Sequence, residues 1–406
     1  MIQARCRNFG YVALAIGLFV LMAGKIVIES GSARNTQVYL WLLFPSLCVV
    51  LYRIFVLRKL NISLWCWPWL LYLAWAALST SWATASDVDA WSIAKRSLFI
   101  CLFIVAIFQL MTKPIHFKRI LILSLLVIAL GALASLLYQY LILDRPLVYR
   151  AYRIDRLGFG DFANFRWPVA AGIFYGSIAV WALGFALNKK TGRYMAILCF
   201  SCFIIMSLYV LLTYSRGAWF GLMIAALLST LLCKSGRARW FLMLGTFCVL
   251  VLVVLFWSQI INEVETNRLS GRGAIWRYFF EVMSGHWLLG FGLGTPFEFI
   301  WSDGVTVSPH AHSLYLQQVY DSGLISLSLL LLAIGAVLWR SWGARDEYWI
   351  QIAVPVLIFA LIAMLTDVER ILVRPGDMWV VFWLPVAVVL ATISRDRKAN
   401  RDSDCF

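Results

Sequence analysis

The fold is decided where two long apolar runs flank a polar stretch of about fifty residues. The first run reads WFLMLGTFCVLVLVVLFWSQI (240–260), and the second reads HSLYLQQVYDSGLISLSLLLLAIGAVLW (312–339). Each is long enough to cross a bilayer as a helix, which takes about 20 mostly apolar residues. The polar stretch between them, residues 261–311, is therefore predicted to form one large loop at a membrane face.

The composition extends this pattern to the whole chain. Hydrophobic residues make up 62% and charged residues 14% of the 406 residues, whereas soluble domains have about 25% charged residues. This excludes a soluble globular protein. The sequence predicts an all-α integral membrane protein that forms a single polytopic domain over residues 1–406, with no nucleic-acid partner and membrane lipids around it.

The apolar runs predict about twelve membrane-spanning helices. They lie near residues 9–28, 37–57, 64–80, 91–111, 118–142, 167–187, 194–213, 217–233, 240–260, 312–339, 347–366 and 378–394. A cytoplasmic N-terminus places most of the lysines and arginines in short inner connections, in agreement with the positive-inside bias. Both termini are therefore predicted to be cytoplasmic, and the large loop lies outside, between helices nine and ten.

The basic residues that remain on the outer side are mostly arginine. Eleven of them are Arg145, Arg150, Arg153, Arg156, Arg166, Arg216, Arg268, Arg272, Arg277, Arg370 and Arg374, whereas the outer lysines, Lys25 and Lys95, lie at helix ends. A topology signal counts lysine and arginine alike, whereas only the planar guanidinium grips phosphate through two parallel hydrogen bonds. The outer face is therefore predicted to bind a phosphorylated ligand, with Arg150, Arg153 and Arg156 among its contacts. The alternative is that these arginines bind lipid headgroups or pair with acids such as Asp155.

Arg216 lies between two apolar runs, in the segment YSRGAW (214–219). A charged residue at membrane depth costs about 2.5 to 3.5 kcal/mol on insertion scales, so such residues are usually paired or functional. We therefore predict that Arg216 binds phosphate. The alternative is an arginine that reaches toward the membrane surface at a tight turn, where Gly217 relieves the backbone.

The start of the large loop predicts a helix that lies in the membrane interface. After Gly271, apolar residues fall on one side and polar residues such as Arg277 on the other, at helical spacing. The positive end of this helix, beside Arg272, is a predicted anion site, and Arg277 is a further predicted substrate contact. The glycines of residues 290–294 are interpreted as a close-packed re-entrant turn.

Two histidines, His310 and His312, are predicted to begin the helix at 312–339. Two positions on a helix differ by about 200° of rotation, so the two imidazoles are not expected to face one point. This argues against a metal site, and Asp87 and Asp89 are interpreted as solvated loop acids. Either histidine is a candidate general base, and the alternative is a histidine that only caps the helix.

Four motifs resemble, in the same order along the chain, the O-antigen ligase family, which shares its core domain with O-antigen polymerases. They are YSRGAWFG (214–221), GRGAIW (271–276), LGFGLG (289–294) and HSLYLQ (312–317). The core resemblance covers residues 205–338. Ser313 occupies the position where the family commonly has asparagine.

The resemblance implies a GT-C type glycosyltransferase. Such ligases transfer O-antigen polysaccharide from undecaprenyl pyrophosphate to the lipid A core at the periplasmic face of the bacterial inner membrane, without a metal or other cofactor. By position in the motifs, Arg216 and Arg272 are expected to hold the donor pyrophosphate. His312 is expected to deprotonate the acceptor hydroxyl, with inversion at the anomeric carbon.

Three further residues around the last motif, His310, Tyr315 and Gln317, are predicted substrate contacts. An O-antigen polymerase is the first alternative function, although it usually has two large outer loops and the second candidate here, residues 143–166, is short. A polysaccharide transporter or flippase is a second alternative. It would need charged residues through the middle of the bilayer, whereas this chain concentrates them at one face.

Overall fold

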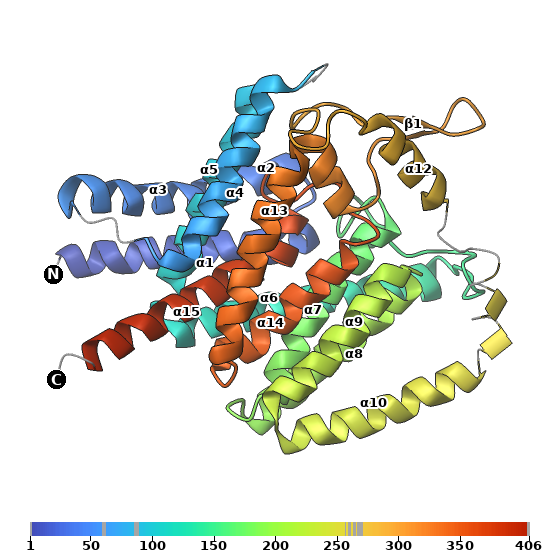
Figure 1. Ribbon diagram of the computed structural model, residues 1–406. Helices are drawn as coiled ribbons and strands as arrows, with labels where there is room; N and C mark the ends of the chain where they lie inside the picture. Colours follow the sequence, from blue (N-terminus) through green and yellow to red (C-terminus); the bar gives the residue numbers. More distant parts are fainter. Residues whose placement is uncertain are drawn as a thin grey trace.

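A computed structural model describes residues 2–58, 62–84, 89–255, 257–258, 261–262, 265 and 271–403. The described residues are mostly helical, as predicted (Figure 1). The helices, with η for short 3₁₀ or π-helical segments, are α1 (Ile2–Val27), α2 (Gly31–Val38), η1 (Tyr39–Leu43), α3 (Phe44–Leu51), η2 (Tyr52–Val56), η3 (Leu64–Cys66), α4 (Trp67–Leu78), η4 (Ser79–Trp82), α5 (Ala90–Leu110), α6 (Pro114–Leu137), η5 (Tyr138–Ile142), α7 (Pro168–Leu187), α8 (Arg193–Leu212), α9 (Arg216–Cys233), α10 (Gly236–Leu255), α12 (Arg272–Val282), α13 (Leu314–Gly343), α14 (Tyr348–Ala363), η6 (Trp379–Trp383) and α15 (Leu384–Ser403).

Nine helices within the described ranges are long and apolar enough to cross a membrane. The prediction of an all-α membrane protein is therefore confirmed, whereas the count of twelve is not. The three remaining predicted segments are helical but shorter. The run at 64–80 is divided between α4 and the flanking turns η3 and η4, α14 has 16 residues, and the run at 378–394 is divided between η6 and α15.

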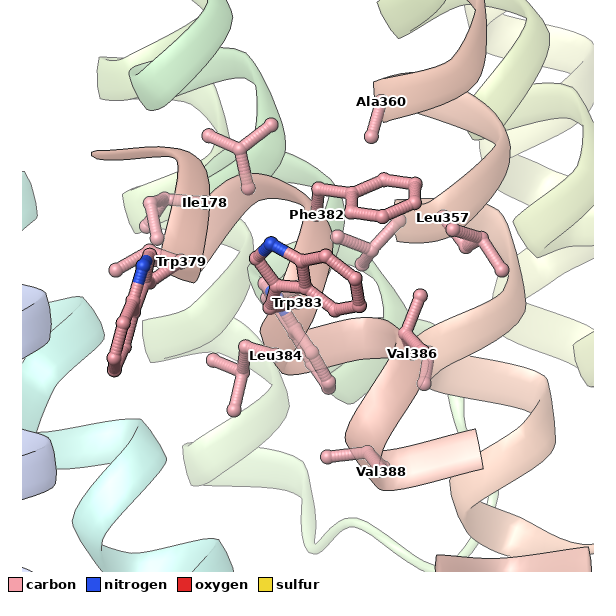
Figure 2. Close-up of a cluster of buried hydrophobic side chains, with 14 of the residues drawn as sticks. Ile178, Leu357, Ala360, Trp379, Phe382, Trp383, Leu384, Val386 and Val388 are labelled. Carbon is pink, nitrogen blue, oxygen red and sulfur yellow. The ribbon is translucent and has the colours of Figure 1, made fainter. Parts of the chain in front are cut away.

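The central helix of the fold is α7. All of its residues from Ala171 to Leu187 are buried, and a helix that is apolar on every side belongs in the interior. Helices α6, α8, α9 and α14 pack around it. The rings of Trp379, Phe382 and Trp383 in η6 are fully buried, and Phe382 points toward Leu357 and Ala360 of α14 (Figure 2). Trp379 instead packs against Phe103 of α5, and Trp383 packs against Trp69 of α4. The turn that carries Arg216 opens α9, which packs against this central helix.

Helix α13 is bent at Gly323, whose backbone lies at φ 76° and ψ 177°. The glycine-rich turn that follows α12 fills the bend. The amide of Phe291 donates a hydrogen bond to the carbonyl of Tyr320 at 2.8 Å, and the amide of Leu324 donates to the carbonyl of Trp287 at 2.8 Å. The turn at 290–294 is thus closely packed against protein, as predicted.

Replacing Gly323 with alanine is expected to destabilise the protein. A Cβ atom there would overlap the carbonyl oxygen of Leu288, and this glycine-only backbone region alone costs a non-glycine residue about 1 to 3 kcal/mol. Thermal unfolding of the purified protein in detergent measures the effect as a lower Tm. Gly335→Ala is the matched control in the same helix, because a Cβ there meets nothing within 4 Å. Equal Tm values for the two variants would contradict this account.

The large loop also contains a short hairpin that the sequence did not predict. Strands β1 (Phe299–Ile300) and β2 (Val307–Ser308) pair antiparallel. A second apolar core, distinct from the one around α7, packs α12 against this loop and the start of α13. Its buried members are Ile275, Phe279, Met283, Phe297, Ala311, Val319 and Tyr320. This core brings the beginning of α12 close to the residues that precede α13.

The two ends of the chain point away from this loop. In Figure 1, α1 begins and α15 ends on the left, whereas α12 and the hairpin lie at the upper right. The loop from Leu143 to Arg166 lies at the same end of the molecule as the large loop. Its Ile154 amide donates a hydrogen bond to the carbonyl of Leu212, at the end of α8 and just before the turn that carries Arg216. The segments that were predicted to share the outer face therefore meet in the fold.

Candidate active site

Two histidines and one aspartate come together immediately before α13. His310 Nε2 and His312 Nδ1 lie 3.6 and 3.5 Å from Asp367 Oδ1, and the centroids of the two imidazole rings are 4.1 Å apart. Burial alone would raise the pKa of Asp367, but the two histidines outweigh it and hold that pKa well below its ordinary value. Asp367 is therefore an ionised carboxylate facing both imidazoles.

The prediction that both histidines begin the helix and point apart is wrong. Helix α13 begins at Leu314 with Ser313 as its N-cap residue. His312 precedes the helix with φ 49°, in the left-handed region. Helical rotation does not apply to this segment, and its non-helical backbone directs both imidazoles to the same carboxylate.

The backbone of the histidine segment is fixed at Ala311, which is fully buried. The side-chain oxygen of Gln317 accepts a hydrogen bond from the Ala311 amide at 2.9 Å. Trp276 Nε1 donates to the Ala311 carbonyl at 3.0 Å. Helices α12 and α13 thus both hold the short segment that presents the two histidines.

A buried ion pair supports this arrangement from inside α13. Gln317 Nε2 donates to Asp321 Oδ1 at 3.0 Å, and Arg370 grips the same carboxylate through Nε at 2.6 Å and Nη2 at 2.8 Å. Burial opposes the charge of Arg370, yet the Asp321 carboxylate raises the pKa of that guanidinium. A buried carboxylate needs such pairing to remain charged.

Two predicted substrate contacts have other roles in this geometry. Gln317 is fully buried and uses its amide nitrogen and oxygen within the protein. Tyr315 donates its hydroxyl to the carbonyl of Leu361 at 3.0 Å. Both side chains therefore support the site from within, and the prediction that Gln317 touches a substrate does not fit its burial.

Arg272 lies next to the histidines because it opens α12. Its Nη2 atom is 3.8 Å from Asp367 Oδ2. Burial lowers the pKa of Arg272, the carboxylate of Asp367 opposes this shift, and the charge of Arg216 adds to it. Arg216 and Arg272 thus lie close enough for their charges to repel each other.

Arg153 joins them from the loop at 143–166. Its Nε atom donates to the carbonyl of Thr213 at 2.9 Å, beside the turn that carries Arg216. Burial and the charge of Arg150 lower the pKa of Arg153, the carboxylate of Asp367 raises it, and the charge of Arg272 lowers it further. We call Arg150, Arg153, Arg216 and Arg272 the arginine cluster.

The remaining predicted residues are placed differently. Arg156 is held by a bidentate pair with Asp155, at 2.9 Å for each bond, which is the pairing alternative noted above. Arg277 is exposed on α12. Asp89 caps α5 by accepting the Ser92 amide at 3.1 Å, whereas Asp87 and Arg268 lie outside the described residues.

The histidines and Asp367 could also hold a metal. Each offers one ligand atom, and these three atoms lie within 4.8 Å of one another. Imidazole nitrogen and carboxylate oxygen are ligands that Zn²⁺ accepts. The positive charge of Arg272, whose Nη2 atom lies 3.8 Å from the Asp367 carboxylate, would repel a metal cation bound there.

The site is open enough for a substrate group to reach it. The side chains of His310 and His312 are 18% and 28% exposed. Both ring nitrogens of His310 and Nδ1 of His312 are buried and, within the described ranges, have no hydrogen-bond partner. Because Nδ1 of His312 faces Asp367, Nε2 on the other side of this more exposed imidazole is the nitrogen that a hydroxyl could approach.

Comparisons with known proteins agree with the four motifs. Residues 201–331 match the family model described as O-Antigen ligase, and this range includes all four motifs. The chain is also 26% identical, over 395 residues, to a protein of Pseudomonas aeruginosa named O-antigen ligase. That alignment covers 97% of this chain and 94% of the relative. The predicted resemblance is therefore confirmed.

Proposed function

From this resemblance to the O-antigen ligase family, we propose that the protein is a GT-C type glycosyltransferase. It transfers O-antigen polysaccharide from undecaprenyl pyrophosphate to the lipid A core at the periplasmic face of the bacterial inner membrane. The observation that carries the proposal is the contact of Arg272 with the carboxylate that faces His310 and His312. An anion site and a base thus share one centre.

The arginine cluster binds the donor pyrophosphate. The charges of Arg150 and Arg272 lower the pKa of Arg153, and the charge of Arg216 lowers the pKa of Arg272, so an anion placed among them would relieve this repulsion. Arg216 and Arg272 bind the phosphate next to the sugar, and Arg153 supports them from the neighbouring loop. As the bond between the anomeric carbon and the phosphate oxygen breaks, its electron pair moves to that oxygen, where guanidinium groups stabilise the growing charge.

His312 activates the acceptor. Its imidazole takes the proton of the acceptor hydroxyl while that oxygen attacks the anomeric carbon from the side opposite the phosphate. The configuration of the sugar is therefore inverted. Asp367 orients the imidazole and stabilises the imidazolium that forms, as a carboxylate does in other histidine-dependent enzymes.

The proposed reaction needs no metal, because the arginines supply the positive charge that a cation would provide. Reconstitution with purified lipid-linked glycan and lipid A core tests this directly. We expect ligated product at the same rate with and without a chelator. A loss with chelator that Zn²⁺ restores would instead assign a metal to His310, His312 and Asp367.

The same assay separates ligase from polymerase. An O-antigen polymerase would extend the lipid-linked glycan in the absence of lipid A core. We expect no extension and a strict requirement for the acceptor, measured by the size distribution of the glycan products.

A further inference from the structure

A second group of cations lies apart from the arginine cluster, at the start of α5. It lines a pocket of about 310 Å³ formed by Tyr39, Ser92, Lys95, Arg96, Phe99 and Arg374. Arg374 belongs to the segment between α14 and η6 that also carries Asp367 and Arg370. Arg370 in turn reaches the large loop, with Nη2 3.5 Å from the carbonyl oxygen of Thr295. The pocket is therefore at the same end of the molecule as the active site.

Within the described residues, no carboxylate balances the charge in this pocket. Three of the six lining residues are cations and none is an acid. In the described part of the chain, no ion pair links Lys95, Arg96 or Arg374 to a carboxylate. The charge of Glu369 reaches Arg96, but the Glu369 carboxylate already binds Arg370 Nη1 at 2.6 Å.

Arg96 has hydrogen-bonding capacity to spare. Its Nε atom is buried and, within the described residues, has no hydrogen-bond partner. Its Nη1 atom reaches the carbonyl of Leu372 at only 3.5 Å. A buried donor without a partner is unfavourable, and more so when it is charged, so this guanidinium is suited to a ligand that supplies acceptor oxygens.

We propose that this pocket binds a phosphate group of a membrane lipid. A phosphate supplies several acceptor oxygens, and its negative charge would balance the three cations of the pocket. The rings of Tyr39 and Phe99, with centroids 5.4 Å apart, give the pocket an apolar wall. Tyr39, Ser92, Lys95, Arg96 and Phe99 all lie on helices apolar enough to cross the membrane, which places the pocket within reach of lipid headgroups.

Two sources can supply such a phosphate. One is the anionic phospholipid that surrounds the protein. The other, which rests on the proposed function, is a phosphorylated acceptor glycolipid, held by the segment that also presents Asp367. In the second case the pocket would anchor the acceptor lipid while its sugar reaches His312.

Lipid binding to the purified full-length protein, measured by native mass spectrometry, tests the proposal without requiring activity. The probes are phosphatidylglycerol, and lipid A core with and without its phosphates. We expect Arg96→Gln and Arg374→Gln each to weaken binding of at least one phosphorylated probe about tenfold or more. Lys189→Gln, which removes an exposed cation in the turn between α7 and α8, should leave binding unchanged. Since Arg374 is exposed, its variant keeps the test informative if Arg96→Gln fails to fold.

The pattern of losses identifies the source. If removing the phosphates weakens lipid A core binding by wild-type protein but not by Arg374→Gln, the pocket holds the acceptor. If Arg374→Gln weakens the binding of phosphatidylglycerol but not that of lipid A core, the pocket holds a structural phospholipid. If neither probe distinguishes wild-type protein from both pocket variants, the proposal is overturned. His312→Ala protein should bind these lipids normally, so a failure of the ligase proposal would leave this result intact.

Discussion

Replacing His312 with alanine is expected to lower the ligation rate by about 10²- to 10⁴-fold, the usual contribution of a general base. Donor binding should persist, because the arginine cluster lies on other segments. The rate is measured with reconstituted donor and acceptor at saturating concentrations, and donor affinity is measured separately with the lipid-linked glycan. Ligation by His312→Ala at a near wild-type rate would remove His312 from the chemistry.

Two further variants show which of the neighbouring groups acts with His312. His310 is about as far from Asp367 as His312 is, but it is less exposed, so His310→Ala should cost much less activity. Asp367→Asn keeps the size of the side chain and removes the charge that stabilises imidazolium. It should therefore lower the turnover rate without weakening donor binding. If His310→Ala causes the larger loss instead, the roles of the two imidazoles are exchanged.

Replacing Arg216 with lysine is expected to reduce kcat/KM for the donor by about 10²-fold or more. The substitution keeps the positive charge but loses the planar fork that binds two phosphate oxygens at once. Loss of one preorganised donor to a developing oxyanion typically costs about 10² to 10³ in rate. The size of the loss therefore shows whether Arg216 acts through two parallel hydrogen bonds or through its positive charge alone.

A matched control for this substitution is Arg166→Lys. Arg166 is an exposed arginine of the neighbouring loop, and it should tolerate lysine without loss of ligation. Equal activity of Arg216→Lys and wild-type protein would mean that a point charge suffices at this position.

Much of the fold follows directly from hydropathy, because a spanning helix must be apolar over about 20 residues. The helix count does not, since 3₁₀ and π-helical turns divide runs that look uniform in sequence. The run at 64–80 is one example, in which only Trp67–Leu78 is α-helical. The bend at Gly323 was likewise hidden, because it depends on the turn from a distant segment that packs into it.

The sequence singled out Arg153, Arg216 and Arg272 because arginine suits phosphate, but the same argument also selected Arg156, which pairs with Asp155. The contact of Asp367 with His310 and His312 could not be predicted, because Asp367 lies more than fifty residues farther along the chain and only the fold brings it to the histidines. One signal was available: acids beside apolar helices need a partner, and both Asp321 and Asp367 have one here. The helical-rotation argument failed because it assumed that α13 begins before His312.

The attachment of the histidine segment through Ala311 makes the site unusually easy to dissect. Trp276 and Gln317 form hydrogen bonds only with main-chain atoms of that alanine, so replacing either neighbouring histidine leaves both hydrogen bonds in place. Loss of activity in those variants then reports chemistry, whereas removal of the Gln317 amide would unfasten both imidazoles together.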